Sequence, residues 1–253
     1  MRRSFARLVV LLLAGLAAAS AARAEDLLNP HWTFTGPFGT FDRAAAQRGF
    51  QVYKEVCSTC HALSLLYYRN LTALGFTEDE VKAIAAGYKV QDGPNDQGEM
   101  FERPARPSDP FVKPFANEKA ARASNNGAYP PDLSLITKAR EGGPDYVYSI
   151  LNGYGDMPQG FKLSEGMNYN KYFAAGEHQI AMPQPLQPNQ VTYADGTPST
   201  LPQEAHDVVT FLAWASEPEL EARHRIGLES MIFLVLLTVL LYAVKRKVWA
   251  SIH

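Results

Sequence analysis

Cys57-Ser58-Thr59-Cys60-His61 is the stretch around which the rest of this 253-residue chain is organised. Two cysteines three positions apart, followed at once by histidine, form the C-x-x-C-H pattern of a covalent c-type haem site. Residues three apart on a helix share a face, so both sulfurs can reach the two vinyl groups along one porphyrin edge. His61 stands in the same turn and can place an imidazole nitrogen on the iron. The motif therefore predicts one haem c attached through Cys57 and Cys60, with His61 as a metal ligand.

Two other interpretations of the cysteine pair are a thioredoxin-like redox pair and half of a zinc site. A redox pair is expected near a βαβ pattern, which this sequence does not show. A zinc site needs more sulfur or histidine ligands at short spacing. The chain has only two cysteines, and both lie in the motif. Haem attachment is the interpretation that the sequence favours.

The overall composition is that of a globular protein, with 46% hydrophobic and 20% charged residues. The net charge of -2 offers no basic surface, so no nucleic acid is expected as a partner. Seventeen prolines and eighteen glycines predict many loops. The fold class expected is mainly α: a haem domain with long Pro/Gly-rich loops, followed by one C-terminal transmembrane helix.

Both ends of the chain carry features of membrane targeting. Residues 1–24 combine a basic start, an apolar run and a small-x-small ending, as in a cleaved secretory signal. The apolar run is too short to favour the alternative of a retained anchor. Residues 226–244 are long and apolar enough to cross a hydrocarbon layer of about 30 Å as a helix. The alternative of a C-terminal core helix is disfavoured, because too little chain follows to cover it.

These features predict four parts: a signal at 1–24, a haem domain at 25–225, a span at 226–244 and a tail at 245–253. The basic residues on the two sides of the span are nearly balanced, so they orient it only weakly. The signal decides the orientation, because it exports the N-terminal part. We therefore expect a single-pass protein of the bacterial inner membrane, with the haem domain in the periplasm and the C-terminus in the cytoplasm.

Caps and helical periodicity predict five helices in the haem domain. They run from Asp42 to about Val56, from Thr77 to Gly87, from Asp132 to about Glu141, from Pro144 to Gly153, and onward from Thr200. Gly49 lies within the first of them and costs about 1 kcal/mol against alanine, so another helix, the one after Thr200, is expected to approach it closely. Residues 91–117 are expected to form a long loop, and residues 153–200 to be rich in turns without convincing strands.

Iron in an electron carrier usually takes a ligand on each face, and the second one is methionine or histidine. The available side chains are Met100, Met157, Met167, Met182, His31, His178 and His206. Met157 and Met182 both precede proline, which fixes the local backbone and could hold a sulfur toward the iron. The residues alone favour Met182, which lies in an extended Pro-rich stretch, but leave the choice open.

Longer stretches around these residues carry a resemblance. The chain resembles the cytochrome c1 family, the haem-c subunits of the ubiquinol–cytochrome c oxidoreductase (cytochrome bc1) complex, and bacterial members in particular. The resemblance covers nearly the whole chain after the signal. It is carried by these stretches: RGFQVY at 48–53 before the haem motif, NNGAYPPDLS at 125–134, AR at 139–140, GPDYV at 143–147, IAMP at 180–183, FLAWASEPE at 211–219 and YAVKR at 242–246.

The resemblance implies that His61 and Met182 are the axial ligands. It also implies that four further residues line the haem, namely Asn125, Pro131, Arg140 and Tyr146, with Arg140 near a propionate. Some relatives carry an extra cysteine pair that bridges a loop before the methionine. This chain lacks that pair, so the loop at 153–178 must be ordered in another way or be shorter and self-supporting.

The function implied by the resemblance is one-electron transfer within a respiratory or photosynthetic bc1 complex. Electrons would come from the Rieske iron–sulfur protein and go to a c-type cytochrome, beside cytochrome b in the same membrane complex. The subunit would make or break no bond by itself. A free-standing membrane-anchored cytochrome and a thiol–disulfide enzyme are the alternatives from other classes. Co-purification with cytochrome b would distinguish a bc1 subunit from a free-standing cytochrome. A haem stain that survives denaturation would exclude a thiol–disulfide enzyme.

Overall fold

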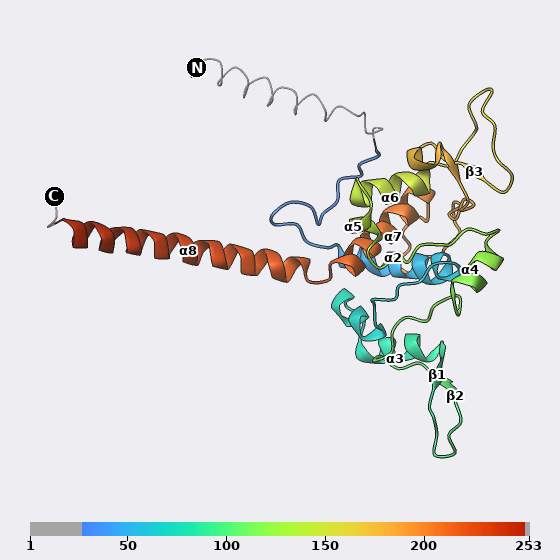
Figure 1. Ribbon diagram of the computed structural model, residues 1–253, viewed down its shortest axis with the longest axis horizontal. Helices are drawn as coiled ribbons and strands as arrows, with labels where there is room; N and C mark the ends of the chain where they lie inside the picture. The colour runs from blue at the N-terminus through green and yellow to red at the C-terminus, as the bar shows by residue number, and fades with distance from the viewer. Residues whose placement is uncertain (1–26, 251–253) are drawn as a thin grey trace, which may run out of the picture.

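The computed structural model describes residues 27–250 and is mostly helical, as predicted (Figure 1). The expected signal at 1–24 lies outside the described residues. The α-helices are α2 (Arg43–Glu55), α3 (Glu78–Ala86), α4 (Glu118–Ser124), α5 (Ile136–Ala139), α6 (Gly143–Asn152), α7 (Leu201–Ser216) and α8 (Leu220–Trp249). The described residues also form three 3-10 helices, η1 (Cys57–Thr59), η2 (Tyr68–Leu74) and η3 (Ala174–Gly176). The four strands are short: β1 (Lys89–Asp92), β2 (Phe101–Pro104), β3 (Asn168–Tyr169) and β4 (Gln179–Ile180).

The core forms where α2 lies along α7, with α5 and α6 packed against α7. Asp42 caps α2 by accepting from the Ala45 amide, and Thr200 caps α7 by accepting from the Gln203 amide. The close helix approach predicted at Gly49 is confirmed, because a Cβ there would overlap the carbonyl oxygen of Asp207 in α7. This contact holds the end of α2, and the haem motif after it, at a set distance from α7.

Aromatic side chains fill the space around this helix pair. Phe211 of α7 is fully buried, with its ring 5.6 Å from that of Phe50 and 5.8 Å from that of Tyr53. Phe111 reaches the same cluster from the long segment after β2, with its ring 6.2 Å from Tyr53. Burying such rings contributes most of the stability of a small core, and here it places Tyr53 directly before the haem motif.

The helix predicted from Asp132 to Glu141 is wrong in its extent, since α5 covers only Ile136–Ala139. The Asp132 carboxylate accepts from the Ser134 amide two residues on, which forms a turn instead of a first helical turn. The other predicted helices are confirmed. They include α3 with its Thr77–Glu80 capping box.

The expectation that residues 91–117 form a loop is also wrong in part. β1 pairs antiparallel with β2, from Lys89 opposite Pro104 to Asp92 opposite Phe101, and this hairpin projects from the domain (Figure 1). Arg103 pairs with Asp92 and, at 2.6 Å, with Asp109, which ties the hairpin to the chain after it. The segment at 153–200, expected to have no strands, contains the two-residue strands β3 and β4.

Helix α8 runs for 30 residues and contains the span predicted at 226–244. Its most apolar 18-residue window has a mean hydropathy of 2.2, and none of that window is buried against the rest of the described structure. Figure 1 shows it projecting alone from the domain. Its base is fastened by Glu221, which accepts two hydrogen bonds from Arg43 and one from the Phe41 amide.

Candidate functional site

The haem motif directly follows α2 in a tight 3-10 turn. The amides of Cys60 and His61 both donate to the Cys57 carbonyl, at 3.1 and 2.9 Å. The hydroxyls of Ser58 and Thr59 donate back to the carbonyls of Lys54 and Val56. Cys57 opens η1 and Cys60 is its C-cap, so the two cysteines lie close together in a turn that is tighter than an α-helix.

His61 is held in one tautomer by a partner far along the chain. Its Nδ1 lies 2.8 Å from the carbonyl oxygen of Pro131. A carbonyl oxygen can only accept, so Nδ1 carries the proton and Nε2 keeps its lone pair in the neutral ring. Burial lowers the pKa of His61, which favours this neutral form. A neutral imidazole oriented through its other nitrogen is the form that binds iron.

Asp132 sets the position of the Pro131 carbonyl. Its carboxylate accepts from the amides of Ser64, at 3.1 Å, and Ser134, at 2.8 Å. The Leu133 amide also donates to the Ala62 carbonyl at 2.9 Å. Burial acts to raise the pKa of Asp132, but the hydrogen bonds from Ser134 and Ser64 outweigh it and hold the pKa below its usual range. The segment 131–134 is thus fastened beside the residues that follow His61.

The donor set at this turn fits a haem c. Cys57 and Cys60 are both free thiols, and burial together with the neighbouring Cys60 raises the pKa of Cys57 to about 12. A thiol–disulfide enzyme relies on a lowered cysteine pKa, and the shift at Cys57 runs in the opposite direction. Within residues 27–250 no group of three or more His, Cys, Asp or Glu side chains is arranged so that it could hold a metal ion.

The structure places Arg140 and Tyr146 near each other, at the end of α5 and in the first turns of α6. The charge of Arg140 acts to lower the pKa of Tyr146, while burial, the larger effect, raises it. Arg140 is exposed and Tyr146 is half-buried, so the guanidinium of Arg140 is open to solvent beside the Tyr146 phenol. Asn125 lies elsewhere, at the end of α4, and its side-chain amide donates to the Ala121 carbonyl at 2.7 Å.

The candidates for the second axial ligand differ in burial. The side chains of Met100, Met157 and Met167 are 63%, 49% and 39% exposed, whereas Met182 is half-buried. The Met182 carbonyl accepts a hydrogen bond of 3.0 Å from the Tyr154 hydroxyl. Among these four methionines, Met182 is therefore the one whose backbone and surroundings are most constrained.

Among the candidate histidines, His206 is already engaged in packing. Its ring stacks on Trp32, with 5.0 Å between centroids, and its Nδ1 lies 3.6 Å from Asp207. His31 is exposed and has a positive φ of 61° in the N-terminal loop. His178 is half-buried beside the ring of Tyr169.

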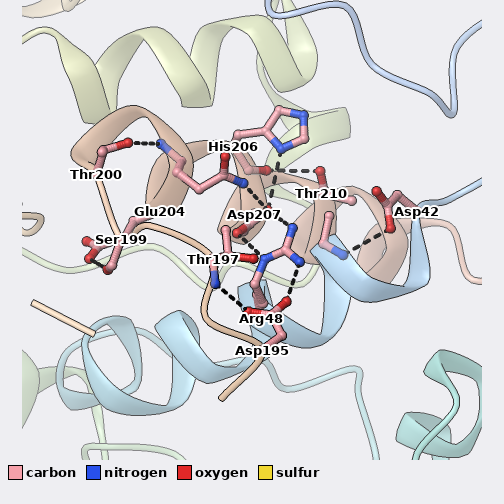
Figure 2. A network of polar contacts seen from close by, with 12 residues as sticks. Asp42, Arg48, Asp195, Thr197, Ser199, Thr200, Glu204, His206, Asp207 and Thr210 are labelled. Carbon is pink, nitrogen blue, oxygen red and sulfur yellow. Dashed lines mark hydrogen bonds and ion pairs between the residues drawn. The ribbon is translucent and has the colours of Figure 1, made fainter. Parts of the chain in front are cut away.

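The segment after Met182 is fastened to the core by Arg48, as Figure 2 shows. The guanidinium donates to both oxygens of the fully buried Asp207, at 2.8 and 3.1 Å, and to Asp195 at 2.9 Å. Burial acts to raise the pKa of Asp207, but hydrogen bonds from His206, Arg48 and Gln203 hold the pKa below its usual range. The Gln203 side chain, at the third position of α7, donates to Asp207 at 3.0 Å.

Sequence reasoning did not single out the supporting residues Arg48, Asp132, Tyr154 and Asp207. Arg48 and Asp132 stand inside stretches that carry the family resemblance, which was the available signal. Nothing in the periodicity of the chain marks Tyr154 as a partner of a residue 28 positions away.

Comparison with known proteins now decides the family, because the family model described as "Cytochrome C1 family" matches residues 32–252. This chain belongs to the cytochrome c1 family. A cytochrome c1 of Rhodospirillum rubrum is 46% identical over 257 residues, covering 94% of each chain. A mitochondrial cytochrome c1 haem protein of Arabidopsis thaliana is 50% identical over 237 residues, covering 92% of this chain and 76% of that one.

A third relative is longer than this chain. The protein named cytochrome b/c1 in Bradyrhizobium diazoefficiens is 51% identical over 244 residues, covering 88% of this chain but only 35% of its own length. Membership of the cytochrome c1 family identifies the chain as the haem-carrying electron-transfer subunit of a bc1 complex. One haem c is attached through Cys57 and Cys60, and α8 anchors the subunit in the membrane.

Proposed function

We propose that this subunit takes single electrons from a Rieske iron–sulfur protein and passes them to a c-type cytochrome, in a membrane complex with cytochrome b. The observation that carries the proposal is the neutral, oriented His61 next to two free cysteines. The name of the Bradyrhizobium relative, which joins a cytochrome b to a cytochrome c1, supports cytochrome b as a partner. Purification of the subunit should therefore bring cytochrome b and a Rieske protein with it.

His61 and Met182 are proposed as the axial ligands. A haem held by Cys57, Cys60, His61 and Met182 would supply one-electron redox chemistry, with no bond made or broken in a substrate. The chain supplies an oriented Nε2 from His61 and a half-buried thioether from Met182. Methionine with histidine favours a high reduction potential.

Four further residues complete the proposed haem environment: Asn125, Pro131, Arg140 and Tyr146. The role of Pro131 is supported by its hydrogen bond to His61. The exposed guanidinium of Arg140 can bind a haem propionate in a two-point contact, which is the geometry that arginine offers to carboxylates. Tyr146, whose pKa Arg140 influences, stands next to that contact.

The proposed topology has a cleaved signal at 1–24 and a periplasmic haem domain at 25–225. The membrane helix is 226–244 and the cytoplasmic tail 245–253. Protease added to the outer face of intact inner membranes should digest the haem domain and spare an epitope placed after residue 253. Loss of the epitope under the same conditions would reverse the orientation.

Replacement of Met182 by leucine tests the ligand assignment. We expect the haem to stay covalently attached, because Cys57 and Cys60 are untouched. The reduction potential should fall sharply and quinol-driven reduction of cytochrome c should be lost, because the iron loses a ligand that favours the ferrous state. The matched control Met157→Leu changes an exposed methionine and should leave both measurements as in the parent. An unchanged ligand-field spectrum in M182L would move the axial role to Met157 or a histidine.

A further inference from the structure

The segment that carries Met182 has few backbone hydrogen bonds of its own. β4 ends at Ile180, and Met182 is followed by Pro183 and Pro185. These two prolines have no amide proton to donate. A hydrogen bond to the carbonyl of Met182 itself comes from the hydroxyl of Tyr154, at 3.0 Å.

Tyr154 is itself held in place through Asn170, which is completely buried. The Asn170 side-chain amide donates to the Ile150 carbonyl in α6 at 2.8 Å, and its side-chain oxygen accepts from the Tyr172 amide at 3.1 Å. The Lys171 amide donates to the Gly153 carbonyl at 2.9 Å, and Tyr154 pairs with Asn170 as an isolated antiparallel bridge. These contacts leave the Tyr154 backbone little freedom relative to α6.

The same asparagine closes the connection from the other direction. Its backbone amide donates to the His178 carbonyl at 2.9 Å, directly after the pairing of Asn168 with Ile180 between β3 and β4. The path from α6 therefore reaches Met182 twice, once through the Tyr154 hydroxyl and once through β3 and β4. This double attachment orders a loop that has no disulfide.

We propose that Tyr154 is a positioning residue for the Met182 ligand, with Asn170 as the buried anchor that holds it. The proposal rests on the assignment of Met182 under the proposed function. A methionine sulfur binds ferric iron weakly and is readily displaced by other ligands. Its binding therefore depends on a backbone that holds the side chain in position. The hydroxyl of Tyr154 keeps the Met182 carbonyl, and with it the side chain, at a set distance from α6.

The test is Tyr154→Phe in the full-length subunit within its membrane complex, titrated with imidazole in the ferric state. An external ligand binds only to haem from which methionine has dissociated, so its apparent affinity scales with that fraction. Loss of one hydrogen bond should raise the apparent imidazole affinity by up to about tenfold. The red charge-transfer absorption of methionine-ligated ferric haem should weaken, the midpoint potential should fall, and covalent haem content should equal that of the parent.

Tyr169→Phe is the matched control. Tyr169 lies in β3 of the same two-stranded sheet and packs its ring against Phe161. Removing its hydroxyl leaves the backbone pairing of β3 with β4 and the bond from Tyr154 to Met182 in place. Parent-like imidazole affinity in Y169F, with a raised affinity in Y154F, would support the proposal. An equal change in both variants, or parent-like affinity in Y154F, would overturn it.

Met182→Leu separates this inference from the proposed function. If M182L keeps the methionine absorption, Met182 is not the ligand and the proposed assignment fails. If M182L loses that absorption while Y154F matches the parent in imidazole affinity, the assignment stands and only the role of Tyr154 fails.

Discussion

The two segments proposed to face the iron are built in different ways. The Cys57–His61 segment joins two covalent attachment points and one ligand within a single turn, and its hydrogen bonds mostly link residues three or four apart. The segment around Met182 has no regular structure after β4 and depends on Tyr154, 28 residues away, and on the Arg48 network. The first is a local structure and the second is a product of tertiary contacts.

This difference predicts which segment is the weaker one. A ligand adjacent to a covalently bonded cysteine cannot move far when the surrounding protein loosens. A ligand that only hydrogen bonds and packing present can dissociate while the domain stays folded. Substitutions in the supports of the Met182 segment should therefore change iron ligation, whereas substitutions in the supports of His61 should change stability with little effect on ligation.

Arg48→Leu should have the largest effect on the comparison. It leaves Asp207 buried without its partner and releases Asp195 of the segment that follows Met182. Breaking such a buried pair costs about 3–5 kcal/mol in free energy of unfolding, and imidazole should displace Met182 more readily. Denaturation of the detergent-solubilised subunit, followed by circular dichroism, measures the first effect. The control Arg43→Leu removes a partly exposed pair with Glu221 and should cost about 1 kcal/mol or less. Equal losses in both variants would contradict the role of burial.

Gly49→Ala should have an intermediate effect on both segments together, because it acts on the helix packing that they share. The added methyl overlaps the Asp207 carbonyl and forces α2 away from α7. Such overpacking costs about 1–3 kcal/mol in free energy of unfolding, measured by the same denaturation. Gly155→Ala is the control, since a Cβ there meets nothing within 4 Å. Unchanged stability of G49A would show that the helices can separate freely.

Asp132→Asn should have the smallest effect on stability, and it tests whether a support of His61 can be weakened without changing iron ligation. It weakens the bonds to Ser64 and Ser134 and should cost about 1 kcal/mol in free energy of unfolding, with imidazole affinity unchanged. Because the pKa of Asp132 is lower in the folded protein, its contribution is fully present above the unfolded pKa, about 3.9. That contribution is lost as the pH falls through the folded pKa. Stability of D132N should therefore fall less than that of the parent below about pH 4. A large rise in imidazole affinity of D132N would contradict the comparison.

The sequence by itself determined the features that depend on neighbours along the chain. The haem motif, the caps at Asp42 and Thr77 and the apolar helix near the C-terminus each leave a short, regular pattern. Gly49 also predicted a close helix contact, because a glycine in the middle of a helix lowers its stability unless such a contact requires it.

The way in which these features are held together depends on contacts between residues far apart in the sequence. The bond from His61 to Pro131 joins residues 70 apart, and that from Tyr154 to Met182 joins residues 28 apart. Asp132 forms a turn where a helix was predicted, because its carboxylate accepts hydrogen bonds from the amide of Ser134, two residues on, and from the amide of Ser64 in a distant segment. Contacts of this kind have no period and no fixed spacing, because they depend on the path of the folded backbone and not on the order of residues.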